Sequence, residues 1–202
     1  MIKYFTLVLV ILSTLLAKAQ SEPGFRLGYE VSGLVSQVGG DNTAGFSKIG
    51  MGAGITSTLV LASENKFKFG ITYIQKGSRI YADFEKGVEA YRLAVNYIEV
   101  PLIWELDILE KWFEFGLTVS KSISLTESRN RVEFLDPREA KFAEAGIILG
   151  YKHHLTNNKA IHLRYGNSLS PFRDHAGGLV RRLNLGQMHH YFQFTFSQSF
   201  GG

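Results

Sequence analysis

Histidine is the residue type in this sequence that most readily suggests a metal or acid–base site, because imidazole binds transition metals and exchanges protons near neutral pH. The 202-residue chain has six histidines and no cysteine. His153 and His154 are adjacent, and neighbours on a strand point to opposite faces, so this pair cannot chelate one ion. His175, His189 and His190 could meet through the last long loop but follow no recognisable ligand spacing. The sequence therefore predicts no metal site, no cofactor and no catalytic set.

Charged residues that alternate with apolar ones form a second chemically capable group. They share one parity within their segments, so on a strand they point to the same face. We expect that face to line the inside of a closed sheet, where buried charges must be paired. A small ion path or a lipid-modifying site would be another use of this face, but no spacing of Ser, His and Glu marks an active site. The predicted inward network consists of Lys68, Arg92, Glu114, Glu144, Lys152, His162 and Arg164.

The elements that must position these residues are β-strands, because large apolar residues recur at every second position through most of the chain. The clearest case is the stretch from Phe67 to Trp104, where two alternating segments flank a long polar loop, as in a hairpin. Eight strands of about ten residues follow from this pattern, enough to cross a hydrocarbon layer at a tilt. Their cores are residues 25–35, 49–59, 67–76, 91–104, 113–120, 144–152, 161–166 and 192–200.

The connections between the predicted strands alternate strictly between long and short, beginning and ending with a long one. The short turns are rich in loop-forming residues, as in residues 63–66 and 156–159. In bacterial outer-membrane barrels the amino terminus and the short turns lie in the periplasm, and the longer loops face outward. Every connection of this chain follows that pattern.

The apolar parity can face the interior, as in a soluble lipocalin-like barrel, or the surroundings, as in a membrane barrel. An eight-stranded barrel has room inside for little more than its own side chains or one small ligand. The strand aromatics are too bulky for that space, whereas glycines such as Gly50, Gly116 and Gly150 suit it. We therefore predict an apolar face toward lipid and a polar lumen. The aromatic residues predicted outside are Phe67, Phe69, Tyr73, Tyr91, Tyr97, Phe113, Phe115, Tyr151, Tyr165, Phe192, Phe194 and Phe196.

Pro101 lies within a predicted strand, although proline has no N–H for a ladder and a closed barrel has no edge strand. A bulge is therefore expected there. The apolar parity agrees, since Tyr91 and Tyr97 use odd positions while Ile98 and Trp104 use even ones. One inserted residue would allow both stretches to present their apolar residues outward.

The start of the chain does not share the alternating pattern. Lys3 supplies a positive charge, residues 4–16 are almost wholly apolar, and Ala19 ends a small-x-small cleavage site before Gln20. The apolar run is shorter than the roughly 20 residues of a spanning helix. We therefore predict a cleaved signal peptide at residues 1–19, with cleavage between Ala19 and Gln20, and one barrel domain at residues 20–202.

Composition restricts the partners of the chain. Without cysteine, neither a disulfide scaffold nor a lipid anchor on a mature amino-terminal cysteine can form. Removal of Lys3 and Lys18 lowers the formal charge from +4 to +2, too little and too scattered for a nucleic-acid partner. Arginines in two long loops could bind lipopolysaccharide phosphates, although solvated loop charge explains them as well. These residues are Arg129, Arg131, Arg138, Arg173, Arg181 and Arg182.

Two short motifs and both ends of the chain resemble a known family. The motifs are Tyr-Ile-Gln-Lys-Gly at residues 73–77 and Asn-Tyr-Ile-Glu-Val-Pro-Leu at residues 96–102. With the Ala19-Gln20 signal end and the closing aromatic strand, the chain resembles the outer-membrane β-barrel domain family of Bacteroidetes, labelled porin-family or PorT-like. The resemblance implies an eight-stranded outer-membrane barrel and supplies no catalytic residues. The chain departs from the usual barrel end by continuing past Phe200 with Gly201-Gly202.

The sequence thus predicts an all-β protein, an eight-stranded antiparallel up-and-down transmembrane barrel in the outer membrane. We expect it to contact outer-membrane lipid, and lipopolysaccharide or a protein through its outer loops. The expected role is structural or loop-mediated, neither enzymatic nor that of a general diffusion pore, because small barrels are filled by their own side chains. Two alternatives are a periplasmic lipocalin-like carrier of an apolar ligand and a lipid-modifying outer-membrane enzyme.

Overall fold

The computed structural model describes most of the chain, and its regular secondary structure is β-strand. No helix in the described ranges is long and apolar enough to cross a membrane. The predicted signal peptide with Ala19 and Gln20, and the terminal Gly201-Gly202, lie outside the described residues. The described residues are 24–40, 45–61, 65–134, 136, 138, 140–175 and 186–200.

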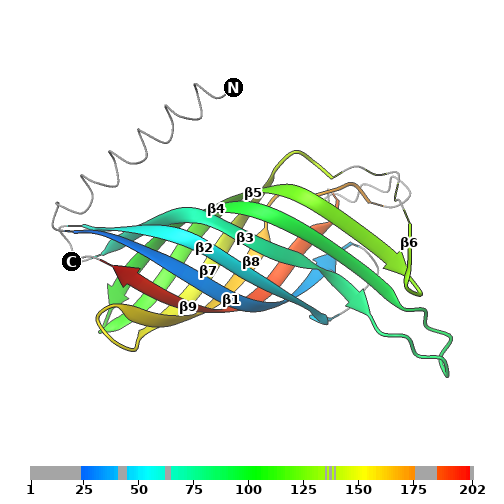
Figure 1. Cartoon of the computed structure of the whole chain (residues 1–202), viewed down its shortest axis with the longest axis horizontal. Helices are drawn as coiled ribbons and strands as arrows, with labels where there is room; N and C mark the ends of the chain where they lie inside the picture. The colour runs from blue at the N-terminus through cyan, green and yellow to red at the C-terminus, as the bar shows by residue number, and fades with distance from the viewer. Residues whose placement is uncertain are drawn as a thin grey trace.

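In the described ranges, nine strands form one antiparallel sheet in which consecutive strands pair, except that β7 pairs with β5 instead of β6 (Figure 1). Pairing of β1 with β9 joins the two ends of the meander, and pairing of β4 with β5 completes the ring. β6 has two residues and pairs only with the last residues of β5, so the barrel wall has eight strands. The strands are β1 (Phe25–Gly39), β2 (Lys48–Val60), β3 (Lys66–Ile80), β4 (Tyr91–Ile108), β5 (Lys111–Arg129), β6 (Val132–Glu133), β7 (Glu144–His154), β8 (Lys159–Ser168) and β9 (Met188–Phe200). The predicted closed eight-stranded up-and-down barrel is confirmed.

The two ends of the barrel differ in the length of their connections, as predicted. One end, here called the turn end, carries the short connections, the start of β1 and the end of β9 (Figure 1). Its tightest turn is Leu109-Glu110, with φ values of 55° and 63°, the left-handed geometry that suits a two-residue hairpin. The opposite end, the loop end, carries the four long connections between β1 and β2, β3 and β4, β5 and β7, and β8 and β9.

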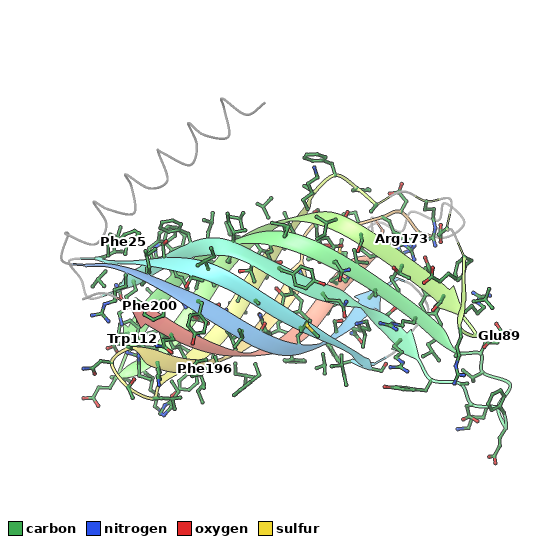
Figure 2. The ribbon with its side chains drawn as sticks, viewed as in Figure 1. Phe25, Glu89, Trp112, Arg173, Phe196 and Phe200 are labelled. Carbon is green, nitrogen blue, oxygen red and sulfur yellow. The ribbon has the colours of Figure 1, made fainter. Side chains whose placement is uncertain are left out.

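Alternation along the strands places apolar side chains outside and polar ones inside. Ile55 is 70% exposed and Phe194 57% exposed, whereas Glu30 and Thr56 are buried in the lumen. Figure 2 shows side chains projecting from the outer side of the strands along the whole barrel. Tyr97 is an exception among the aromatics predicted outside, since it is 1% exposed and lies in the lumen.

The parity error at Tyr97 comes from β4, which contains no bulge at Pro101. β4 keeps one register along β3, from Ile80 opposite Tyr91 to Lys66 opposite Glu105. Its odd-numbered residues therefore point inward along most of the strand, including Leu93, Tyr97 and Glu105. Tyr91 shares that parity, and its hydroxyl donates a hydrogen bond to Glu127. Arg92, which was predicted to point inward, is consequently exposed on the outside.

The extra residue lies in β5 rather than in β4. Asn96 pairs with Ser124 and Tyr97 with Ser122, so Ile123 is left over as a bulge and the inward parity of β5 changes there. Pro101 is accommodated differently. It pairs with Thr118 on β5, while the pairing between β3 and β4 skips Pro101 and its neighbour Val100. The missing N–H thus coincides with a local interruption of the ladder.

The loop end of the lumen is filled by an apolar cluster that strand alternation alone did not indicate. Phe172 comes from the β8–β9 connection and is 2% exposed inside this cluster. Its backbone N–H donates to the carbonyl of Gln187, and its carbonyl accepts from the N–H of Lys141. The cluster residues are Leu34, Val38, Ile74, Leu93, Val95, Tyr97, Phe172 and Tyr191.

The dense packing of this interior makes a prediction for Gly166. A Cβ added there would overlap the ring of the buried Tyr191, whereas one at the exposed Gly33 would meet no described atom within 4 Å. We expect Gly166→Ala to lower the free energy of unfolding by roughly 1–3 kcal/mol, because overpacking forces neighbours out of place. Gly33→Ala should leave it nearly unchanged. Urea unfolding in detergent micelles measures both, and equal stability of the two variants would contradict the packed interior.

Candidate functional site

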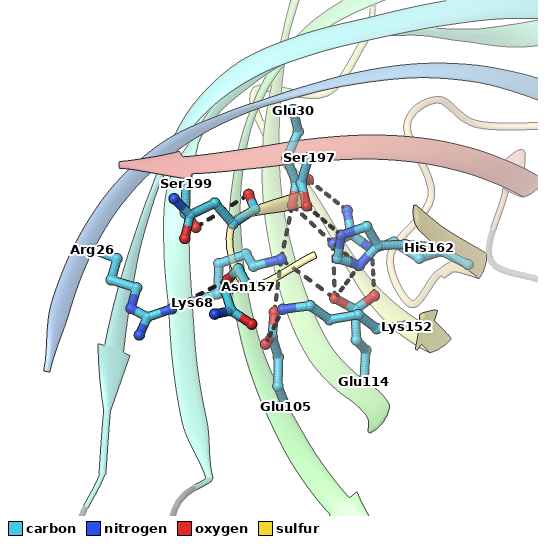
Figure 3. Close-up of polar contacts among 12 residues, drawn as sticks. Arg26, Glu30, Lys68, Glu105, Glu114, Lys152, Asn157, His162, Ser197 and Ser199 are labelled. Atoms are coloured by element: carbon cyan, nitrogen blue, oxygen red, sulfur yellow. Dashed lines mark hydrogen bonds and ion pairs between the residues drawn. The ribbon is translucent and has the colours of Figure 1, made fainter. Parts of the chain in front are cut away.

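Seven inward-facing residues near the middle and turn end of the lumen form a continuous set of ion pairs and hydrogen bonds, here called the lumen ion cluster (Figure 3). They come from six strands, because each strand turns its polar parity inward. All seven side chains are at most 8% exposed. The members are Glu30 on β1, Lys68 on β3, Glu105 on β4, Glu114 on β5, Lys152 on β7, and His162 and Arg164 on β8.

Arg164 is the centre of the cluster. Its Nη1 donates to Oε2 of Glu30 at 2.7 Å, and its Nε donates to Oε2 of Glu114 at 2.6 Å. Its Nη2 also reaches Oε1 of Glu30 at 3.1 Å and Oε1 of Glu114 at 2.9 Å. Such forked contacts between a guanidinium and carboxylates are the strongest ion pairs of proteins. Arg164 therefore ties strands on different sides of the lumen to one another.

Two lysines complete the charge balance of the cluster. Lys68 Nζ lies 2.8 Å from Oε1 of Glu30 and 2.7 Å from Oε1 of Glu105, and Lys152 Nζ lies 2.6 Å from Oε2 of Glu105. With Arg164 and Glu114, the cluster holds three cations and three carboxylates. Buried charges are tolerated when they are paired in this way.

A second set of ion pairs lies nearer the loop end. Lys76 Nζ lies 2.7 Å from Oε2 of Glu99 and 3.6 Å from Oε1 of Glu144. Glu144 also lies 2.9 Å from Nδ1 of His189 and accepts hydrogen bonds from the hydroxyls of Tyr97 and Ser168. Lys76 belongs to the 73–77 motif and Glu99 to the 96–102 motif. The two sequence motifs therefore supply the two halves of one buried ion pair.

Arg173 closes the loop end of the lumen. It is fully buried, and its Nη1 and Nη2 donate to the two carboxylate oxygens of Glu127 at 2.6 and 3.1 Å. Asp136 lies 3.5 Å from Nη1 of Arg173, and a hydrogen bond from Arg138 lowers the pKa of the Asp136 carboxyl to about 2. Arg138 also donates to the carbonyl of Asp174 at 3.0 Å. Arg173 and Arg138, two of the loop arginines that could bind lipopolysaccharide phosphates, thus already have carboxylate partners within the protein.

Six of the seven predicted network residues lie in the lumen, and Arg92 does not. Lys68, Glu114, Lys152, His162 and Arg164 belong to the lumen ion cluster, and Glu144 belongs to the second set. The prediction omitted several inward residues, although Glu30, Lys76 and Glu99 occupy the polar parity of their segments, which was a sufficient signal for them. Glu105 lies just beyond the strand core predicted for residues 91–104, because β4 continues to Ile108. The omitted residues are Glu30, Lys76, Glu99, Glu105, Glu127, Arg173 and His189.

One chain of hydrogen bonds has the order found in serine hydrolases. Nδ1 of His162 lies 2.9 Å from Oε1 of Glu114, and Nε2 lies 2.8 Å from Oγ of Ser197 on β9. A His162 whose Nδ1–H donates to Glu114 can accept the hydroxyl proton of Ser197, which is the arrangement that activates a serine nucleophile. No group of three His, Cys, Asp or Glu side chains in the described part of the chain is arranged to hold a metal ion.

The balance of the lumen ion cluster makes a prediction for Glu114. Glu114→Gln keeps the shape of the side chain but removes a charge, so Arg164 and Lys68 lose part of their compensation. We expect the free energy of unfolding to fall by about 3–5 kcal/mol. The control is Asp83→Asn, which breaks the exposed Asp83–Lys86 pair and should cost at most about 1 kcal/mol. A loss from Glu114→Gln no larger than that of the control would contradict a mutually compensated cluster.

Comparison with known proteins identifies the fold. No protein-family model matches the sequence, and no curated protein matches it either. Neisserial surface protein A has 12% sequence identity and a TM-score of 0.52, with 88% of this chain and 98% of that chain covered. Ail of Yersinia pestis, in complex with the heparin analogue sucrose octasulfate, has 9% identity, a TM-score of 0.48, and 88% and 100% covered. OprG of Pseudomonas aeruginosa has 9% identity and a TM-score of 0.39, with 90% of this chain and 98% of that chain covered.

At these identities the likeness concerns the fold alone, and the statement on the fold rests on the match to Neisserial surface protein A. The chain has the closed eight-stranded fold of small outer-membrane barrels.

Proposed function

We propose that this chain is a small integral outer-membrane barrel that acts structurally or through its outer loops, and that it is neither an enzyme nor a general diffusion pore. The observation that carries this proposal is the division of its side chains between an apolar outer face and a lumen filled by compensated charges. Such a division matches a barrel that meets lipid outside and has no continuous water path inside.

The apolar outer face supports a membrane location. Exposed residues on it extend along several strands, among them Ile55, Ile71, Leu117, Leu163 and Phe194. An exposed apolar surface of this kind marks a membrane or protein contact. A lipocalin-like carrier would need the opposite arrangement, with apolar residues around a ligand cavity. The lumen of this barrel instead contains the lumen ion cluster and the buried Arg173.

The two motifs support membership in the Bacteroidetes outer-membrane barrel family, which we infer as the finer assignment. Lys76 and Glu99 form an ion pair across β3 and β4, so both motifs are needed to satisfy one buried contact. Gly77 follows Lys76 with a φ of 151°, and a Cβ there would overlap the carbonyl oxygen of Leu93. The spacing of the motifs thus has a structural reason within a single barrel.

The loop end offers the surface for a partner. Phe84 is 93% exposed in the β3–β4 connection, which extends beyond the rest of the barrel near Glu89 (Figure 2). Arg129 is exposed at the end of β5, 3.8 Å from Glu89, while Arg181 and Arg182 lie outside the described residues. An exposed aromatic ring beside loop charges favours a protein or lipopolysaccharide contact over a soluble substrate.

The filled lumen predicts the behaviour of the protein in planar lipid bilayers. We expect no stable conductance steps above background from the folded protein, because both sets of ion pairs and the apolar cluster block the lumen. Arg173→Ala should also give no conductance steps, because the lumen ion cluster, which lies nearer the turn end, still fills the lumen. Stable, reproducible steps from the unmodified protein would contradict the proposal, and unfolded protein serves as the control.

A second candidate function is that of an acyl hydrolase. The order of the hydrogen bonds from Ser197 through His162 to Glu114 favours it. Ser197 Oγ would attack an ester carbonyl while its proton passes to His162 Nε2. The bond to the leaving alkoxide then breaks, the alkoxide takes that proton, and water later hydrolyses the acyl-serine. We rank this candidate second because Glu114 already compensates Arg164 and Lys68, so it gives less support to a protonated His162.

A fluorophosphonate probe separates the two candidates, because it modifies activated serines. We expect no labelling of the folded protein. Labelling that is lost in Ser197→Ala but kept in Ser199→Ala would contradict the first proposal and support a hydrolase. Ser199 is a suitable control, since it lies two residues away on the same face of β9 without a contact to His162 among the described hydrogen bonds.

A further inference from the structure

The turn end of the barrel opens into a recess between the start of β1, the end of β9 and the short β7–β8 turn. It has a volume of about 40 Å³, compared with the 10–15 Å³ that one ordered water needs. A few waters or one small oxyanion therefore fit inside it, and a larger solute does not. The charged and imidazole side chains that line the recess are Arg26, Lys66, Lys68, Lys152, His154 and Lys159.

The recess carries uncompensated positive charge. Lys68 and Lys152 are paired with carboxylates of the lumen ion cluster, as described above. Arg26, Lys66 and Lys159 have no carboxylate within 4.0 Å among the described residues, and Glu105 and Asp107 attract Lys66 only from a greater distance. No acidic side chain lies among the described residues that line the recess.

Hydrogen-bond donors in the recess are also incompletely used. Arg26 Nη1 has one long contact, 3.5 Å to the carbonyl oxygen of Asn157. Lys66 Nζ lies 3.9 Å from the centre of the Trp112 ring, a contact that leaves its N–H groups available. His154 Nε2 is buried without a hydrogen-bond partner in the described part of the chain. Figure 3 shows Arg26 on the side of Lys68 away from His162, and Asn157 close to Lys68.

From this combination of volume, charge and free donors, we propose that the recess binds one phosphate group through Arg26, Lys66 and Lys159. Arginine offers two parallel N–H donors to phosphate oxygens, and lysine supplies point charge beside it. The phosphate belongs either to a soluble phosphate or to a lipid head group at the same membrane surface. The site lies at the turn end, so it is separate from the loop-end role proposed above and stands or falls independently of it.

The test is a titration of inorganic phosphate into the folded protein in detergent micelles, followed through backbone amide signals by NMR spectroscopy. We expect saturable shifts at Arg26, Asn157 and Ser199. The double variant R26Q/K159Q should bind phosphate about tenfold more weakly, as expected for lost charge-assisted hydrogen bonds. Lys111→Gln is the matched control, because Lys111 lies at the same end of the barrel but outside the recess, and it should leave the affinity unchanged.

Several outcomes would overturn the site. They are shifts that do not saturate, shifts that sodium chloride of equal ionic strength reproduces, and affinities that R26Q/K159Q leaves unchanged or that Lys111→Gln reduces equally. If the double variant does not fold, as judged by its gel migration without heating, the single variant Arg26→Gln is used in its place.

The same measurement in lipid nanodiscs identifies the source of the phosphate. Shifts that appear with phosphatidylglycerol and no added phosphate indicate a lipid head group, and shifts that require inorganic phosphate indicate a soluble ligand.

Discussion

The contact of Arg164 with Glu30 and Glu114 is the interaction on which the rest of this barrel depends. In the closed ring, β1 and β5 lie opposite each other, and Arg164 on β8 joins their carboxylates across the lumen. The interior of an eight-stranded barrel is largely filled by its own side chains, which leaves little space for water around these charges. The charges must therefore compensate one another, and Lys68, Glu105 and Lys152 extend the same balance. A lumen filled in this way joins strands on opposite sides of the wall, and it is the reason why we propose that the barrel is not a diffusion pore.

The outer face follows from the same constraint. Because strand residues alternate, each inward charge requires that its neighbours point outward, and those neighbours are apolar along most strands. Lys76 and Glu99 show how closely the two faces are coupled, since this pair fixes β3 against β4 while Ile71 and Ile98 remain exposed on the outside. For this reason both of the contacts that we propose lie at the ends of the barrel. The loop end offers exposed aromatic and charged side chains, and the turn end offers a cationic recess.

Much of this architecture could be predicted from the sequence, because a period of two and the lengths of the connections are local signals. The alternation pattern does not show at which residue, or in which of two paired strands, a β-bulge lies. Arg92 was placed inside because the apolar residues of β4 were assumed to face outward on both sides of Pro101, whereas β4 is regular and the bulge is at Ile123 of β5. Phe172 and Arg173 fold back into the lumen from a loop, and a loop has no periodicity from which this could be predicted. The approach of Ser197 to His162 and Glu114 depends on the registers of β5, β7, β8 and β9, which the alternation within one strand does not show.

The most direct test of the central claim, a filled barrel whose apolar face meets lipid, is the gel migration of the protein from cell fractions, with and without boiling. We predict that it is found in the outer-membrane fraction and that the unheated protein migrates faster than the boiled protein, because the compact barrel resists detergent. Protein that is soluble in the periplasm without detergent and shows no heat-dependent shift would contradict the account. That result would mean that the exposed apolar face is covered by something other than lipid.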